Sequence, residues 1–391
     1  MSSINITKCN AYKIKDSRGE DTLEVEMSAG EISVWASVPS GKSTGTREAM
    51  VLPVDKAIEN INNLIAPEII GLEVNFRQID DFILALDGTE NKSKLGANAI
   101  LGISIAVLKL EAKIQHKKLW KHISDITESH VSFPRLFANV INGGPHAGFK
   151  LPFQEYMFVL GDGTNSIETF EQLKVLFELL RGKIEDKENV IMGDEGGFSF
   201  DSKNIEEPFE ILSSLHDTLA IDVAAEEFFD GQNYKIADEN YSADALLEIY
   251  KKLVGKFPLE SIEDPFGEND FEAFRHLVTG LPNGVLVVGD DLTTTNPKMI
   301  SKVIDENLAN CILIKPNQIG TVSETLEAIK KTHEAGLKTI ISHRSGETMD
   351  SFIADLAVGV GAYGIKTGSP SQPERMAKYE RLMEIEKEMN S

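Results

Sequence analysis

The chain of 391 residues is poor in several residue types, and each deficit excludes a class of protein. Its two cysteines, Cys9 and Cys311, are too few for the disulfide framework of a secreted domain, which indicates a reducing cytoplasm. Basic residues are outnumbered by acidic ones, 39 to 62, which gives a formal net charge of −23. Because nucleic acids and anionic membranes bind basic surfaces, neither is expected as a partner.

Long apolar runs are missing as well. The longest candidate, residues 97–108, has the length of a helix in a protein core rather than that of a membrane span. The start, M-S-S-I-N-I-T-K, lacks the apolar segment of a secretion signal, so we expect neither a signal nor a span. Hydrophobic residues make up 41% of the chain, enough to bury the core of one large domain plus a smaller one.

Five short apolar runs between residues 261 and 368 each end in a charged or polar residue, at spacings of 27, 25, 28 and 23. These end residues are Glu263, Asp290, Lys315, His343 and Lys366. A buried parallel strand with its crossover helix and loops takes roughly 25 to 30 residues. Residues 296–308, 322–336 and 347–360, which lie between the runs, carry helical apolar spacing. The pattern predicts an α/β fold with a C-terminal (β/α)8-type barrel, in which the strand ends share one mouth.

Three segments upstream are predicted to complete the barrel: residues 139–159, 190–197 and 219–224. The segment 190–197, V-I-M-G-D-E-G-G, is typical of a strand that ends in two acids and two glycines, and 219–224 of a strand that ends in an acid. Their candidate site residues are His146, Glu155, Glu195 and Asp222.

Residues 1–125 are predicted to form a smaller α+β domain, and residues 126–391 the barrel domain. An antiparallel pair of strands over 23–27 and 32–38 is followed by three helices. These helices begin near Pro53, Asn75 and Ala97.

The loop V-P-S-G-K-S-T-G, from Val38 to Gly45, brackets hydroxyl side chains with glycines. It is either an ordinary polar loop or a mobile flap that brings an oxygen ligand, Ser43 or Thr44, to the barrel mouth.

Three acids on successive strand ends, Asp222, Glu263 and Asp290, would converge at that mouth. Converging carboxylates repel one another unless a cation lies among them, and oxygen ligands favour Mg²⁺ over zinc. The alternative is an ion-pair network in which a lysine or arginine neutralises each acid.

Lys315 follows three apolar residues, so its amine is expected to point into the mouth. Nearby Mg²⁺ and Lys366 would lower its pKa and make it a usable base. Glu155 and Glu195 would supply a pair of carboxyl groups suited to acid catalysis.

The dipeptide Arg344-Ser345, which follows a predicted strand, could bind a phosphate through a guanidinium fork and a hydroxyl. Together with the acids and the lysines, it suggests proton abstraction next to a carboxylate, with a metal stabilising the enediolate.

Motifs along nearly the whole chain resemble those of enolases (phosphopyruvate hydratases). They are D-S-R-G at Asp16, V-P-S-G-K-S-T-G at Val38, G-A-N-A-I-L-G-I-S at Gly96, N-V-I-N-G-G-P-H-A-G at Asn139, Q-E at Gln154, G-D-E-G-G-F at Gly193, S-I-E-D-P-F at Ser261, G-D-D-L at Gly289, K-P-N-Q-I-G at Lys315, S-H-R-S-G-E-T at Ser342 and I-K-T-G at Ile365. The resemblance implies reversible dehydration of 2-phosphoglycerate to phosphoenolpyruvate in glycolysis and gluconeogenesis, with two Mg²⁺ per active site. It also implies a homodimer, or octamers built from dimers.

The resemblance further implies a role for each matched residue. Lys315 matches the base that removes the C2 proton, Glu195 the acid at the C3 hydroxyl, and Glu155 the carboxylate partner of that acid. The metal ligands by this match are Asp222, Glu263 and Asp290 for the first Mg²⁺ and Ser43 for the second. The substrate-binding residues are His146, Gln154, Glu155, Lys315, His343, Arg344, Ser345 and Lys366.

Three departures from the family pattern stand out. Lys42 occupies a flap position where the family usually has a small residue, Glu20-Asp21 replaces Asn-Pro, and Gln372-Pro373 replaces an arginine and a small residue. None of them removes a matched catalytic position. Two alternatives stay open: a related lyase or racemase that acts on another acid, and a paralogue with a non-catalytic binding role.

Overall fold

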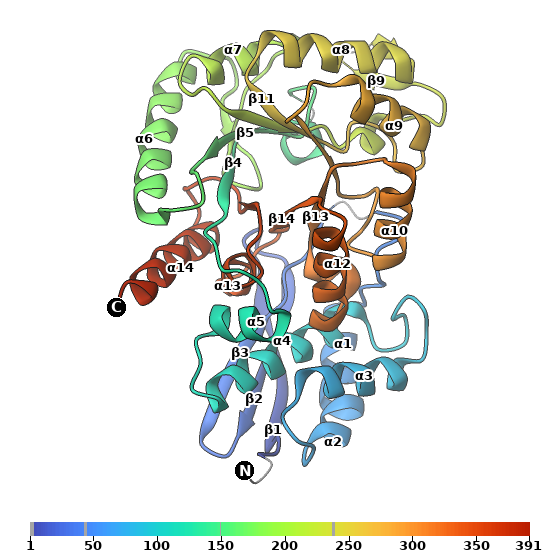
Figure 1. Ribbon diagram of the computed structural model, residues 1–391, viewed down its shortest axis with the longest axis vertical. Coiled ribbons are helices and arrows are strands. Elements are labelled where there is room, and N and C mark those ends of the chain that lie inside the picture. Colours follow the sequence, from blue (N-terminus) through green and yellow to red (C-terminus); the bar gives the residue numbers. More distant parts are fainter. Residues whose placement is uncertain (1–3, 43–44, 149, 237–238) are drawn as a thin grey trace.

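The protein consists of two parts stacked along its long axis (Figure 1). The computed structural model describes residues 4–42, 45–148, 150–236 and 239–391, so Ser43 lies outside the described residues, as does the side chain of His146. A small sheet with helices forms one part, and a larger barrel ringed by helices forms the other (Figure 1). The predicted fold class, a barrel with a smaller N-terminal α+β domain, is confirmed.

The N-terminal sheet has three antiparallel strands in the order β1 (Lys8–Lys15), β2 (Asp21–Ala29) and β3 (Ile32–Ser37). The strands β2 and β3 were predicted, and the chain turns between them at Gly30, whose φ of +61° suits glycine. The first strand was not predicted, because its lysines interrupt the apolar alternation. Alternate side chains of β2, namely Leu23, Val25 and Met27, are fully buried.

Helices follow the sheet along the chain. They are α1 (Val54–Asn60), a π-helical turn (Ile61–Ile65), α2 (Ala66–Ile69), α3 (Phe76–Asp87), α4 (Ala97–Ile114) and α5 (Leu119–Thr127). The first three and α4 pack on the sheet, whereas α3 packs on α4 and α5 packs on the barrel helix α13. The side chain of Asn75 caps α3 by accepting a hydrogen bond from the Gln78 amide. Helix α4 is buried along most of its length, as its nearly uniform apolar composition predicts, because it lies between the sheet and the barrel.

Within the described ranges, eight strands close into the barrel. In order around it they are β4 (Arg135–Asn142), β5 (Glu155–Leu160), β8 (Leu219–Asp222), β11 (Leu259–Glu263), β12 (Leu286–Gly289), β13 (Cys311–Ile314), β14 (Lys338–Ser342) and β15 (Gly364–Lys366), which pairs with β4. All neighbouring pairs are parallel except those of β5, which runs antiparallel to both β4 and β8. Glu155 begins β5 and therefore lies at the rim where the other strands end, paired with Asp222.

The segment 190–197 is not a barrel strand, and that prediction is wrong. The two-residue strands β6 (Ile191–Met192) and β7 (Phe198–Ser199) form an antiparallel hairpin outside the closed barrel, joined to it only through β4. Gly196, with φ of +78°, reverses the chain, and its amide donates to the Gly193 carbonyl. Glu195 therefore lies in a turn rather than at the end of a strand.

Helices surround the barrel on its outside (Figure 1). They are α6 (Ser166–Ile184), α7 (Glu207–Ser213), α8 (Ala243–Lys256), α9 (Phe271–Gly280), α10 (Pro297–Glu306), α12 (Val322–Glu334), α13 (Phe352–Gly359) and α14 (Pro373–Met389). The short helix α11 (Pro316–Ile319) instead lies at the mouth, where it contacts α4 and where Gln318 bonds Asp290. Short elements at the rim are the 3-10 turns Gly144–Ala147 and Ala225–Phe228 and the hairpin β9 (Tyr234–Ile236) and β10 (Glu239–Tyr241). None of the helices in the described part of the chain is both long enough and apolar enough to cross a membrane.

Apolar side chains fill the barrel and leave the polar residues at its rim. The interior cluster includes Phe137, Met157, Val288, Leu313 and Ile340, each at most 2% exposed. The two parts of the protein are also joined by polar contacts at the N-terminus of α12. There the Ser104 hydroxyl accepts from the Val322 amide, and the Asp80 carboxylate accepts from the Ser323 amide.

Candidate active site

One pocket at the carboxyl end of the barrel strands collects most of the predicted site residues. The predicted residues that line it are Gln154, Glu155, Glu195, Asp222, Asp290, Lys315, His343, Arg344, Ser345 and Lys366. Glu263 lies beside them, in contact with Lys366. The N-terminal domain contributes Gly41, Lys42 and Glu48 to the lining of the same pocket. Residues spread over more than 300 positions of the sequence therefore share one chamber.

The ammonium of Lys366 lies in a cage of three carboxylates. Its Nζ is 2.9 Å from Glu155, 3.0 Å from Asp222 and 3.0 Å from Glu263. Burial would lower the pKa of this lysine, but the three carboxylates outweigh it and hold the pKa well above the usual value. Two of the predicted metal ligands are thus paired with a lysine, as in the ion-pair network considered as the alternative.

Lys315, the predicted base, contacts the Asp290 carboxylate directly. Burial is the largest single effect and would lower its pKa, but the neighbouring carboxylates, Asp290 first among them, together outweigh burial, so the pKa is raised and not lowered as expected. The pKa of Asp290 is depressed in turn: burial would raise it, and Lys315 overcomes that effect. The second oxygen of Asp290 accepts from the Gln318 amide at 2.8 Å. The prediction that Lys315 points into the barrel mouth is confirmed.

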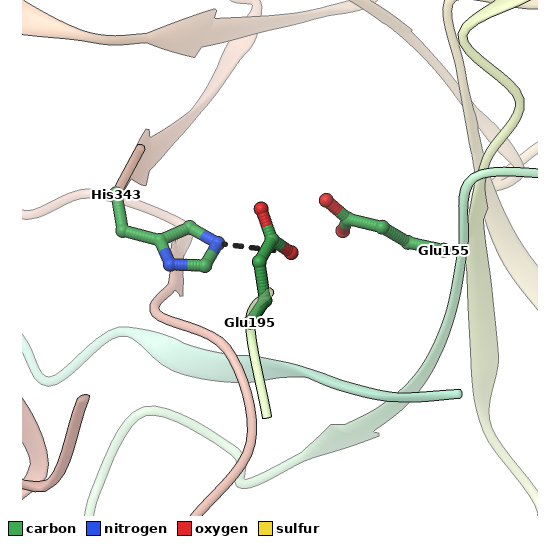
Figure 2. Close-up of side chains that lie close together, drawn as sticks. All are labelled: Glu155, Glu195 and His343. Carbon is green, nitrogen blue, oxygen red and sulfur yellow. Dashed lines mark ion pairs between the residues drawn. The ribbon is translucent and has the colours of Figure 1, made fainter. Parts of the chain in front are cut away.

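Glu195 lies between Glu155 and the imidazole of His343 (Figure 2). The His343 Nε2 atom is 3.7 Å from Glu195 Oε2, and Asn139 donates to the same oxygen at 2.7 Å. Burial, followed by the negative charge of Glu195, raises the pKa of Glu155 well above its usual range. Two carboxyl groups whose charges repel in a buried site can share a proton, which suits acid catalysis.

A second group of acids lies next to the predicted metal ligands. Ligand atoms of Asp264, Asp290 and Asp291 lie within 4.8 Å of one another. Asp264 accepts hydrogen bonds from the backbone amides of both other residues, at 2.9 and 2.7 Å, and so shapes their loop. Burial and the neighbouring Asp290 raise the pKa of Asp291 to about 8. The acids of this group crowd one another in the absence of a cation.

The donor set fits a hard divalent cation. The carboxylates of β8, β11 and β12 meet at one rim, and oxygen ligands of this kind suit Mg²⁺ or Ca²⁺ rather than zinc. The residues that line the pocket also carry an excess of negative charge. Eight are acidic (Glu48, Glu155, Glu195, Asp222, Glu227, Asp264, Asp290 and Asp291) and four are basic (Lys42, Lys315, Arg344 and Lys366). An anionic substrate could enter such a pocket only with cations that offset this excess.

Arg344 and Ser345 lie on the side of the pocket next to the N-terminal domain. Arg344 donates to both oxygens of Glu48 at 3.1 Å. Burial would lower the pKa of the arginine, but Glu48, together with Asp290 and Asp291, outweighs burial and raises it. The Ser345 hydroxyl accepts from the backbone amide of Lys42 at 2.9 Å and from Arg18 at 3.2 Å. Lys42 also forms an ion pair with Asp194, with Nζ 2.9 Å from Oδ2. The flap and the turn that carries Glu195 are thereby linked.

Sequence reasoning missed several residues of this site, among them Glu48, Asn139, Asp264, Asp291 and Arg375, which donates to His343. Asn139, Asp264 and Asp291 lie inside motifs noted above, next to or near a predicted functional residue. They would have been found if every polar residue of those motifs had been counted as a candidate site residue. Glu48 comes from the other domain and Arg375 from the last helix, and no spacing links them to the barrel.

The comparisons with known proteins agree along the chain. The family model described as "Enolase, N-terminal domain" matches residues 6–123, and the one described as "Enolase, C-terminal TIM barrel domain" matches residues 130–391. The enolase of Thermococcus kodakarensis is 44% identical over 98% of this chain and 95% of its own. Enolase B of Dictyostelium discoideum is 40% identical over 99% of this chain and 95% of its own. The similarity therefore includes both parts of the fold and the site between them.

Proposed function

Since the chain belongs to the enolase family, we propose that it catalyses the reversible dehydration of 2-phosphoglycerate to phosphoenolpyruvate, in glycolysis and gluconeogenesis. The observation that carries the proposal is one pocket with a lysine on one strand end and a pair of carboxyl groups from β5 and the hairpin turn. Proton removal at C2 and proton delivery at C3 require two such groups in one chamber.

Lys315 is the proposed base. When its amine is neutral it takes the proton from C2, and the electrons of that C–H bond move into the enediolate. Glu195 then gives a proton to the C3 hydroxyl as the C3–O bond breaks, so that water leaves and the C2–C3 double bond forms. Glu155 lies beside Glu195, and burial together with the charge of Glu195 raises the pKa of Glu155, so the two carboxyl groups are suited to hold between them the proton that Glu195 delivers.

The remaining residues bind and orient the substrate. Arg344 and Ser345 are proposed to hold the phosphate, because a buried guanidinium and a hydroxyl lie together on the side of the pocket next to the N-terminal domain. Lys366 and Gln154 are proposed to hold the carboxylate group. His146 and His343 complete the proposed substrate contacts.

Mg²⁺ is the proposed cofactor, with two ions per active site. Asp222, Glu263 and Asp290 would hold the first ion, and Ser43 of the flap would join the second. When bound, the ions supply positive charge that stabilises the enediolate. Lys366 would give up part of its carboxylate cage to the first ion, because both cations use Asp222 and Glu263.

We further propose that the protein self-associates as a homodimer or as octamers, in the cytoplasm. Exposed apolar side chains support an interface on α6 and the adjacent hairpin: Val175, Leu179, Val190, Ile191 and Met192 are 37–60% exposed. Phe177 of α6 stacks on Phe198 of β7, which brings the hairpin against the helix. Both cysteines are buried free thiols, which suits a reducing compartment. Residues 1–125 and 126–391 remain the proposed domains.

The test follows the ultraviolet absorbance of phosphoenolpyruvate as purified protein meets 2-phosphoglycerate with Mg²⁺. A rise that excess chelator stops is the expected result. A panel of non-phosphorylated hydroxy acids serves as the comparison, because a lyase for such acids would leave Arg344 and Ser345 without a ligand. Turnover of that panel, with none of 2-phosphoglycerate, would overturn the proposal. Folded protein that binds Mg²⁺ without turnover of any acid would favour the non-catalytic paralogue.

A further inference from the structure

Arg375 is the largest of the fully buried side chains in the described part of the protein, and it reaches from α14 to the wall of the pocket. Its Nη1 donates to His343 Nδ1 and to the Arg344 carbonyl, both at 2.6 Å, and its Nη2 donates to the Ser345 carbonyl at 2.8 Å. Among the described residues, no carboxylate forms an ion pair with this guanidinium, and its partners are neutral acceptors. Burying a cation in this way costs free energy, which points to a role beyond packing.

The contact with His343 decides which ring nitrogen carries the proton. A guanidinium has only N–H donors and cannot accept, so Nδ1 must present its lone pair to Arg375. A neutral imidazole with a bare Nδ1 carries its hydrogen on Nε2. If the ring were doubly protonated, the Nδ1–H of His343 would face an N–H of Arg375, and the imidazolium and guanidinium charges would repel each other. Burial is the main cause that holds the pKa of His343 well below its usual value; Glu195 opposes it, and Arg375, Lys366 and Lys315 add to it.

The resulting Nε2–H faces Glu195 (Figure 2). Nε2 lies 3.7 Å from Glu195 Oε2, and the Asn139 amide donates to the same oxygen at 2.7 Å. The hydrogen bond from Asn139 makes Oε2 an acceptor, and the Nε2–H group faces the same oxygen from just beyond hydrogen-bond distance, so a proton held by the carboxyl group belongs on Oε1. An imidazolium at this place would instead stabilise the carboxylate and weaken the hold of Glu195 on its proton.

We propose that Arg375 is a positioning residue for the acid step: by occupying Nδ1 of His343 it keeps the imidazole in the Nε2–H form, and this donor, with Asn139, directs the transferable proton of Glu195 to Oε1. The role given to Glu195 depends on the proposed function, whereas the tautomer does not. The same guanidinium also donates to the carbonyls of Arg344 and Ser345. It therefore connects the acid Glu195, through His343, with the residues proposed to bind the phosphate.

The first test reads the tautomer without any turnover. In protein with ¹⁵N-labelled histidine, the His343 signals are assigned by their loss in the His343→Gln variant. The expected spectrum at neutral pH has a pyridine-type Nδ1 and a pyrrole-type Nε2, and it stays unchanged as the pH falls through the usual pKa of histidine. A pyrrole-type Nδ1, or titration of the ring near that usual pKa, would overturn the proposal. Absence of dehydration by the wild type would overturn the proposed function and leave this readout intact.

The second test compares three substitutions on α14. In Arg375→Met, His343 should titrate at higher pH, the acid limb of the kcat profile should move up, and kcat at neutral pH should fall about 10²-fold. Arg375→Lys keeps a cationic donor and should retain the Nε2–H form with less than about tenfold loss of kcat. Arg381→Lys is the matched control, because Arg381 lies on the same helix, paired with Asp355 and Glu388. It should change neither the spectrum nor the profile.

An Arg375→Met protein with an unchanged His343 spectrum and an unchanged acid limb would contradict the proposal. A purely structural role of Arg375 predicts that outcome, with any loss confined to stability. Should Arg375→Met fail to fold, the spectra of the wild type and of Arg375→Lys decide the tautomer by themselves.

Discussion

Lys366 and Glu263 face each other across the mouth of the barrel, with the ammonium nitrogen 3.0 Å from both carboxylate oxygens. In the closed order of strands, β15 and β11 are separated by three strands on either side, so the contact spans the mouth. The same ammonium contacts Asp222 and Glu155. One cation thus holds together acids of three strands that would otherwise repel one another.

Replacement of this lysine tests whether the acids need a cation. Lys366→Met should lower the free energy of unfolding by about 3 kcal/mol in the presence of chelator, because it leaves buried carboxylates unpaired. Millimolar Mg²⁺ should recover part of the loss, since the same carboxylates can bind the ion. Urea unfolding with and without Mg²⁺ measures both effects.

The matched control is Lys298→Met, which removes an exposed ion pair with Glu90 on the protein surface. It should cost less than about 1 kcal/mol and respond to Mg²⁺ as the wild type does. Equal losses in the two variants, or a Lys366→Met loss that Mg²⁺ leaves unchanged, would contradict the assignment of these acids to the metal site.

Asp80, which lies at the junction of the two parts of the protein, is expected to make the free energy of unfolding depend on pH. Burial raises its pKa to about 6, while its Oδ2 accepts from the Ser323 amide and its Oδ1 has no partner among the described residues. A raised pKa means that the folded protein binds this proton more tightly than the unfolded chain does. Stability from this group is therefore full below the unfolded pKa of about 4 and is lost as pH rises toward 6.

The substitution Asp80→Asn should abolish this loss and raise the free energy of unfolding at neutral pH by up to about 3 kcal/mol. Urea unfolding between pH 4 and 8 measures this difference. In the wild type the loss of stability should extend over about two pH units, from the unfolded pKa to the folded pKa of Asp80. Asp81→Asn, on the exposed side of the same helix, is the control and should follow the wild type. If the unfolding free energies of Asp80→Asn and of the wild type depend on pH in the same way, the raised pKa of Asp80 is contradicted.

Lys42 is the departure from the family pattern that lies nearest the pocket. Its backbone amide, not its side chain, bonds Ser345, and its half-exposed ammonium pairs with Asp194. Lys42→Ala should therefore leave kcat near that of the wild type and raise KM by less than about fivefold, an effect that salt reduces. Steady-state kinetics at low and high ionic strength measure it. A large fall in kcat would mean that this ion pair takes part in the chemical step.

The sequence predicted the parallel half of the barrel well, for a physical reason. A buried parallel strand needs a continuous apolar run, and its last residue must lie at the common rim. Glu263, Lys315 and Lys366 follow this rule, and the cadence of the strands located them.

The rest of the site depends on long-range geometry that no local pattern records. The carboxyl group of Glu155 reaches the rim because β5 runs against its neighbours, and Glu195 because Gly196 turns a hairpin. Arg375 and Glu48 reach the pocket from the last helix and from the other domain. Their contacts follow from the closure of the barrel and the docking of the two parts.

Exchange of the C2 hydrogen of 2-phosphoglycerate with deuterium oxide, followed together with phosphoenolpyruvate formation, tests the separate base and acid most directly. The account predicts that the Glu195→Gln variant still exchanges the C2 hydrogen but forms phosphoenolpyruvate at least about 10²-fold more slowly. It predicts that a folded Lys315→Ala variant does neither. Exchange by Lys315→Ala at the rate of the wild type would contradict the assignment of Lys315 as the base.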